Sequence, residues 1–119
     1  MQENTEVIFD PTFLIEQCGD AEFMIELVEE FVASLPDTKV RLAKLIADLE
    51  YDAAHEEAHT VKGTAANLTA HQLSAAALSL EKASRNSDPE ALNSAMEDFL
   101  DQCNVFESRF EKEREKLLP

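Results

Sequence analysis

The stretch of sequence that decides the fold is AEFMIELVEEFVASLPDTKVRLAKLIADLE, which occupies residues 21–50. Its apolar side chains recur in alternating steps of four and three residues, a spacing that places them on one face of an α-helix. The stripe consists of Met24, Val28, Phe31, Leu35, Thr38, Leu42, Leu45 and Leu49. Pro36 normally ends or kinks a helix, but the stripe keeps its register on both sides of it. We therefore predict one long amphipathic helix over residues 21–50 that bends at Pro36.

Helix start and stop signals divide the rest of the chain. Aspartate is a preferred N-cap and proline is favoured at the first helical position, so Asp10-Pro11 and Asp88-Pro89 mark two helix starts. Asp20 and Asp52 are the predicted N-caps of two further helices, and Gly19 ends the first helix. The predicted helices cover residues 11–18, 21–50, 53–68, 70–86 and 89 to about 116, after a loose lead-in at 1–9.

The composition agrees with a single helical domain over residues 1–119. Ala, Leu and Glu supply 47 of the 119 residues, whereas Val, Ile and Thr supply 16 and there are only two Gly and four Pro. This balance favours helices over a sheet. Four long helices with short connections bury their apolar stripes as antiparallel neighbours. We predict an all-α fold, an antiparallel up-down four-helix bundle with the short N-terminal helix packed on one end.

The net charge of −15 argues against general binding to nucleic acid or to an anionic membrane surface. The first 38 residues contain ten acidic and no basic residues, so phosphate chemistry is expected in the later part of the chain. Cys18 and Cys103 are too few and too far apart for a disulfide framework or a Cys-rich zinc site. The N-terminus has no basic, apolar leader, and no segment has the ~20 apolar residues of a membrane span. We expect a cytoplasmic protein.

His59 stands out within the predicted helix over 53–68. With ~100° per residue, the apolar stripe of that helix centres roughly 130° away from His59, so the imidazole is expected to point to solvent. The stripe consists of Ala54, Ala58, Val61, Ala65 and Leu68. The same helical geometry places Asp52, His55, Lys62, Gly63 and Ala66 around His59 on the exposed face.

Gly63 is unexpected in a helix, because glycine there costs about 1 kcal/mol relative to alanine. A glycine one turn beyond His59, with only a methyl group at Ala66, leaves the imidazole clear for another protein's backbone. Lys62 adds a compact cation suited to holding a phosphoryl group. An imidazole nitrogen that lacks its proton is a competent nucleophile. The residues together predict an exposed, phosphorylatable histidine.

The run from Ala58 to Leu68, AHTVKGTAANL, resembles the H-x-x-K-G-[ST] motif of histidine-containing phosphotransfer (HPt) domains. The resemblance extends over about residues 9–110 and includes Phe9-Asp10-Pro11 and the segment from Leu73 to Leu80-Glu81. It implies that His59 is the phosphoryl acceptor, Lys62 its electrostatic partner and Gly63 the clearance residue for a docking receiver domain. The docking surface that it implies also includes His55, Ala66, Asn67 and Arg85, of which Asn67 and Arg85 are candidate contacts for the phosphate or the receiver.

The same resemblance implies a carrier in a phosphorelay. His59 would take a phosphoryl group from the aspartyl phosphate of a response-regulator receiver domain and pass it to the aspartate of another. A hybrid sensor kinase is an implied partner, and Mg²⁺ is expected on the receiver rather than on this chain. No Gly-rich nucleotide loop is present, so we expect no kinase activity, no bound cofactor and no metal site. We expect a monomer.

Two other interpretations remain open at this point. His55-Glu56-Glu57-Ala58-His59 matches H-E-x-x-H, the zinc-protease helix, and Glu81 lies 22 residues beyond His59, where a third ligand is possible. A helical bundle of this length offers no strand or deep cleft for a peptide substrate, which argues against a protease. The second alternative is a purely structural helical adaptor, in which His59 is dispensable. His71 is expected to be a surface or capping residue.

Overall fold

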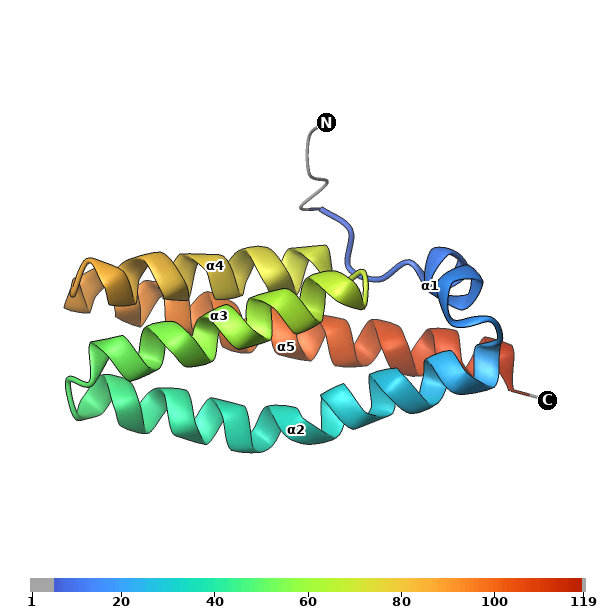
Figure 1. The fold of residues 1–119 in the computed structure, drawn as a ribbon, viewed down its shortest axis with the longest axis horizontal. Helices are drawn as coiled ribbons and strands as arrows, with labels where there is room; N and C mark the ends of the chain where they lie inside the picture. The colour runs from blue at the N-terminus through green and yellow to red at the C-terminus, as the bar shows by residue number, and fades with distance from the viewer. Residues whose placement is uncertain (1–5, 119) are drawn as a thin grey trace.

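The structure is a computed structural model and describes residues 6–118. This part of the chain contains five helices and no strand, so the predicted all-α class is confirmed. The helices are α1 (Pro11–Cys18), α2 (Ala21–Ala47), α3 (Tyr51–Asn67), α4 (His71–Arg85) and α5 (Pro89–Leu117). In Figure 1 the four long helices lie side by side, and successive ones run in opposite directions.

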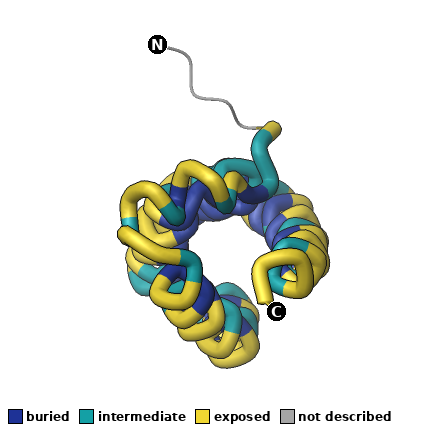
Figure 2. Tube along the Cα trace, turned by 90° about the vertical axis from the view of Figure 1, so that its right-hand side faces the viewer, coloured by how far each residue is buried: buried dark blue, intermediate teal, exposed yellow. Residues whose placement is uncertain are grey.

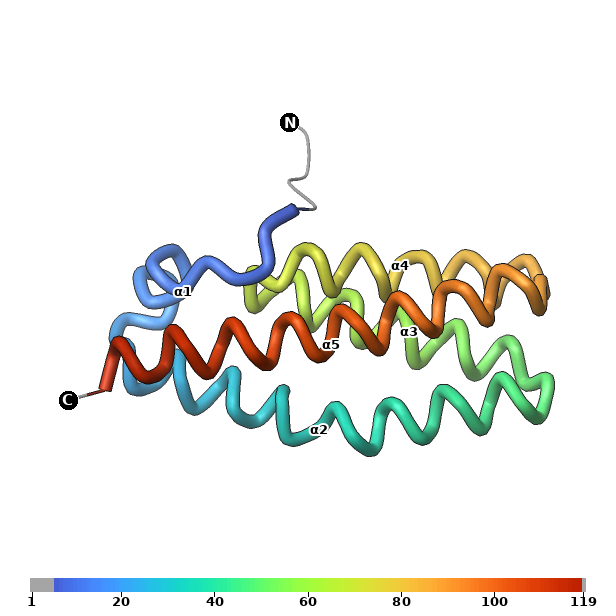
Figure 3. Tube along the Cα trace, turned by 180° about the vertical axis from the view of Figure 1, so that it is seen from behind, coloured from blue at the N-terminus to red at the C-terminus, as the bar shows by residue number. Residues whose placement is uncertain are grey.

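The contacts between helices form a closed ring in the order α2, α3, α4, α5 and back to α2, and α1 packs on α2. Figure 2 views the four long helices end-on, and their buried residues face the centre of the ring. Figure 3, from behind, shows α5 running between α4 and α2. The core includes Phe99, Phe106, Phe110, Met24, Leu35, Leu42, Leu73, Leu80 and Leu92, all almost completely buried.

Three of the four predicted aspartate caps are confirmed. The side chains of Asp10, Asp20 and Asp88 accept hydrogen bonds from the backbone N–H groups three residues later, at 3.1, 2.7 and 3.2 Å. Pro36 lies inside a single continuous α2, as predicted, and α2 is bowed along its length in Figure 1. The retained apolar register explains why the helix continues, because Leu35 and Thr38 on either side of Pro36 are buried.

The predicted N-cap at Asp52 is wrong, because α3 begins at Tyr51 with Glu50 as its N-cap. The predicted end of α2 at residue 50 is also wrong, because α2 ends at Ala47. Leu49 has a left-handed φ of 59° and is 68% exposed, so it leaves the apolar stripe to which the periodicity assigned it. In this conformation the Glu50 N–H bonds back to the Leu45 carbonyl at 2.9 Å, and the chain reverses at once.

The same turn recurs at the next two connections. Thr69 and Ser87 also have positive φ, and the next N–H bonds to the carbonyl five residues back: Ala70 to Ala65 at 2.8 Å, and Asp88 to Ala83 at 3.2 Å. These three tight turns align each helix closely with its successor.

The expectation of a loose lead-in at 1–9 is corrected for its described part, residues 6–9; residues 1–5 lie outside the described chain. This segment is not helical, but Phe9 is buried and makes edge-to-face contacts with Phe106 and Phe110 at 5.6 and 5.9 Å between ring centroids. The Gln72 N–H donates to the Val7 carbonyl at 2.8 Å. The segment therefore packs against α4 and α5, and aromatic burial is the physical reason.

Candidate functional site

α3 presents His59 to solvent. Ala54, Ala58, Val61 and Ala65 are buried on one side of the helix, and the His59 side chain on another side is 64% exposed. The predicted exposure of His59 is therefore confirmed. The small apolar residues of α3 are spaced so that they share one face of the helix, and the burial of this face leaves His59 on the solvent side.

Glu81 of α4 contacts the Nδ1 side of the His59 imidazole. Its side chain is only 5% exposed, and Oε1 lies 2.5 Å from His59 Nδ1. Oε1 and Oε2 also accept hydrogen bonds from Lys62 Nζ at 3.1 and 3.3 Å. A carboxylate only accepts hydrogen bonds, so His59 Nδ1 carries a proton, and in the neutral ring Nε2 is the nitrogen without one. Two donors thus satisfy a buried charge that would otherwise be unfavourable.

The ionisation of Glu81 follows from the same contacts. Burial raises the pKa of the Glu81 carboxyl, but hydrogen bonds from His59 and Lys62, together with the positive charge of Lys62, outweigh burial. The net pKa lies below its ordinary value, so Glu81 is a carboxylate at neutral pH.

His55 and Arg85 complete a hollow on this side of the molecule. The Arg85 guanidinium nitrogen Nη2 lies 3.0 Å from His55 Nε2. The His55 and His59 rings are stacked, with centroids 6.4 Å apart and planes 8° from parallel. The hollow is lined by His55, Glu56, His59, Thr60, Lys62, Glu81 and Arg85.

Four of the predicted site residues therefore meet in one hollow: His55, His59, Lys62 and Arg85. The expectation that His55, Lys62 and Ala66 lie on the exposed face is corrected, because all three are half-buried on α3, which packs against α4. Lys62, for example, is 27% exposed and reaches back to Glu81.

The other predicted residues lie outside the lining of the hollow. Gly63 is exposed, and a Cβ added there has no atom within 4 Å, so packing in this chain does not require glycine. Asn67 is exposed at the end of α3. His71 begins α4 as predicted but is half-buried.

The role of Glu81 in the His59 site was missed from the sequence, where Glu81 was named as the end of a segment similar to the family and as a possible third zinc ligand, but not as a partner of His59. A signal was present, since Glu81 lies between Leu80 and Ala83 on the inward face of its helix. A carboxylate at such a position needs cationic or hydrogen-bonding partners. The sequence did not tell which partners they are, because they come from another helix.

The arrangement does not favour the zinc-protease interpretation. The Arg85 guanidinium faces Nε2 of His55, and Glu81 is held by His59 and Lys62. Within residues 6–118, no group of three or more His, Cys, Asp or Glu side chains is placed to hold a metal ion.

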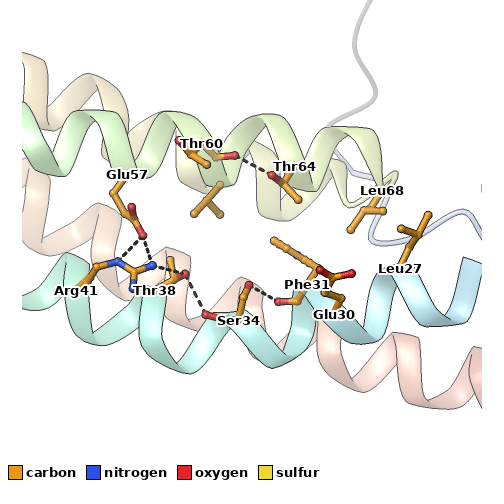
Figure 4. A pocket seen from close by; sticks show the side chains of 11 residues that line it. Leu27, Glu30, Phe31, Ser34, Thr38, Arg41, Glu57, Thr60, Thr64 and Leu68 are labelled. Carbon is orange, nitrogen blue, oxygen red and sulfur yellow. Dashed lines mark hydrogen bonds and ion pairs between the residues drawn. The ribbon is translucent and has the colours of Figure 1, made fainter.

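An open groove of about 440 Å³ runs between α2 and α3 (Figure 4). Its apolar lining includes Leu27, Phe31, Val61 and Leu68, and Thr60 and Thr64 face it from α3. At one end Arg41 of α2 pairs with Glu57 of α3 at 2.7 Å. Thr60 lines both this groove and the hollow around His59, so the two are adjacent.

Comparison with protein families identifies the class. The family model of the Hpt domain matches residues 26–108, which include all of α3 and α4 and most of α2 and α5. The chain therefore belongs to the Hpt domain family. Hpt domains act in histidine phosphotransfer in phosphorelay signalling, and they interact with receiver domains and kinases of two-component systems.

Comparisons with curated proteins and with solved structures gave no significant match. None of the described helices has the length and apolar character needed to cross a membrane.

Proposed function

We propose that His59 accepts a phosphoryl group from the aspartyl phosphate of a receiver domain and passes it to the aspartate of a second receiver. The observation that carries this proposal is the hydrogen bond from His59 Nδ1 to Glu81, made by a His59 side chain that is itself 64% exposed. The contact leaves Nε2 as the free nucleophilic nitrogen of the ring.

The transfer step needs no general base on this chain. The Nε2 lone pair attacks the phosphorus atom, an N–P bond forms, and the P–O bond to the receiver's aspartate breaks with release of its carboxylate. The ring keeps the Nδ1 proton and becomes positively charged. Glu81 stabilises that charge because its carboxylate already accepts the Nδ1 hydrogen bond.

Lys62 and Arg85 supply positive charge for the phosphoryl oxygens. Lys62 Nζ is anchored to Glu81, one turn after His59 on the same face of α3. Arg85 lines the hollow from α4. Phosphoryl transfer depends mainly on in-line positioning and charge neutralisation, so two cations beside the imidazole meet the requirement for this chain's part of the reaction.

The receiver supplies the aspartate and the Mg²⁺, and this chain acts as a carrier without kinase activity. Gly63 and Ala66 give clearance for the docking receiver, and His55 and Asn67 lie at its edge. A hybrid sensor kinase and further response regulators are the proposed partners of a monomeric protein. The four long helices serve as a rigid antiparallel up-down bundle on which the imidazole is held.

Intact-mass analysis tests the proposal. The protein is incubated with phosphoramidate in one experiment and with receiver domains phosphorylated by acetyl phosphate in another. Each incubation is expected to add one acid-labile phosphoryl group. His59→Gln is expected to abolish the addition and to leave the circular dichroism spectrum close to that of the parent, because the side chain lies outside the apolar core. Its melting temperature is expected to fall by no more than the loss of one hydrogen bond to Glu81 causes. His71→Gln is the matched control and should label normally. Labelling that persists in His59→Gln would move the acceptor to His55 or His71.

The same experiment distinguishes the adaptor alternative. A purely structural adaptor predicts no phosphoryl addition to the parent protein and receiver binding that is unchanged in His59→Gln.

A further inference from the structure

His55 makes a contact that the transfer step above does not use. Arg85 Nη2 lies 3.0 Å from His55 Nε2. A guanidinium group has only donors, so Nε2 of His55 accepts the hydrogen bond and the ring is neutral with its proton on Nδ1. The contact therefore fixes the tautomer of His55 and ties the end of α4 to α3.

The contact also determines where the guanidinium lies. Arg85 is the last residue of α4 and is exposed, and a long side chain in that position samples many rotamers unless it is held. His55 stacks on the acceptor ring, with 6.4 Å between the centroids, so a guanidinium held by His55 lies at the same hollow as His59. Because the holding group is a neutral ring, the contact leaves the positive charge of Arg85 available.

The other charged groups near the hollow explain why Arg85 needs a neutral hydrogen-bond partner such as His55. Lys62 is already bound to the Glu81 carboxylate. Glu56 also lines the hollow and is exposed, so it competes for a guanidinium that is not held elsewhere. Arg41, the cation of α2 that pairs with α3, is bound to Glu57 beside the groove between these helices.

We infer that His55 is a positioning residue that holds Arg85 beside His59, ready to bind the oxygens of the arriving phosphoryl group. The inference rests on the proposed function of His59. His55 forms no bond to phosphorus; it acts through Arg85, whose guanidinium matches the geometry of phosphoryl oxygens.

A double-mutant cycle tests the dependence of His55 on Arg85. The rate of phosphohistidine formation from phosphoramidate is measured by intact mass at pH 8 for the parent, His55→Leu, Arg85→Ala and the double variant. We expect His55→Leu to slow phosphorylation by roughly five- to tenfold in the parent, and to have little effect in the Arg85→Ala background. His55→Gln retains an acceptor at this position and is expected to restore most of the rate.

An equal effect of His55→Leu with and without Arg85, or no effect in the parent, would overturn the inference. Thermal melts of all variants identify any loss of folding. If the parent acquires no phosphoryl group at all, the proposed function itself fails, and that result differs from a parent that labels normally but shows no coupling.

The imidazole tautomers give a second readout that needs no phosphoryl donor. Long-range ¹H–¹⁵N NMR of the parent at pH 8 is expected to show His55 with the proton on Nδ1. Arg85→Ala is expected to move this proton toward Nε2 and leave the His71 signals unchanged. A His55 ring protonated on Nε2 in the parent would contradict the inference directly.

Discussion

The two glycines of this chain allow one prediction to be worked out in both directions. Gly63 lies inside α3, whereas Gly19 follows α1 with a left-handed φ of 98°. An added Cβ has no atom within 4 Å at either position, so neither substitution to alanine changes packing. The backbone conformation alone decides the sign of the effect on stability.

Gly63→Ala is expected to raise the free energy of unfolding by up to about 1 kcal/mol, because alanine loses less conformational entropy in a helix. For a domain of this size the melting temperature should rise by about 3–5 °C. Gly19→Ala is expected to lower the free energy of unfolding by about 1–2 kcal/mol, since a Cβ is strained at positive φ. Thermal and urea denaturation of both variants measure these changes.

Function should separate from stability at Gly63. Gly63→Gln also restores helix propensity, so it should fold at least as well as the parent, but its side chain lies one turn from His59 in the path of a docking receiver. We expect transfer to a receiver to slow by roughly tenfold or more, with weaker receiver binding. Ser108→Gln, on the exposed surface of α5 away from the hollow, is the matched control and should transfer normally.

Two results would refute this reasoning. Transfer by Gly63→Gln at the parental rate would show that clearance is not why glycine occurs here. A Gly63→Ala variant no more stable than the parent would show that the backbone at this position is not that of an ordinary helix.

Two further predictions concern the acidic side of the site and metal dependence. Glu81→Gln is expected to destabilise the protein by about 1–3 kcal/mol at pH 7, because Lys62 and His59 lose a buried charged acceptor. The folded pKa of Glu81 lies below its ordinary value of 4.5, so its stabilising contribution is complete above that value and is lost as the pH falls through the folded pKa. Melts between pH 7 and pH 3 should therefore show a weaker acid dependence in Glu81→Gln, and an unchanged acid dependence would contradict the assigned carboxylate. EDTA is expected to leave the melting temperature unchanged while transfer from a receiver still requires Mg²⁺; a stoichiometric tightly bound zinc, or peptide cleavage lost in Glu56→Gln, would favour the protease interpretation instead.

Local signals in the sequence were sufficient to predict all five helices and the starts of three of them. Aspartate caps and proline starts placed the beginnings of α1, α2 and α5, because a cap depends on a side chain and on backbone groups only three residues away. The predicted end of α2 and the predicted start of α3 were less accurate. They depend on a left-handed turn at Leu49, and leucine has no intrinsic preference for that conformation.

The sequence by itself determined that His59 is exposed and that glycine and lysine are its neighbours along α3, because helical periodicity fixes the angular position of every side chain on one helix. Only the tertiary structure decided what meets His59 from α4. Glu81 beneath Nδ1, and Arg85 against His55, are 22 and 30 residues from their partners along the chain. These contacts depend on the rotation and offset of two packed helices, which result from the burial of both apolar stripes and from the tight turn at Thr69, so no local pattern contains them.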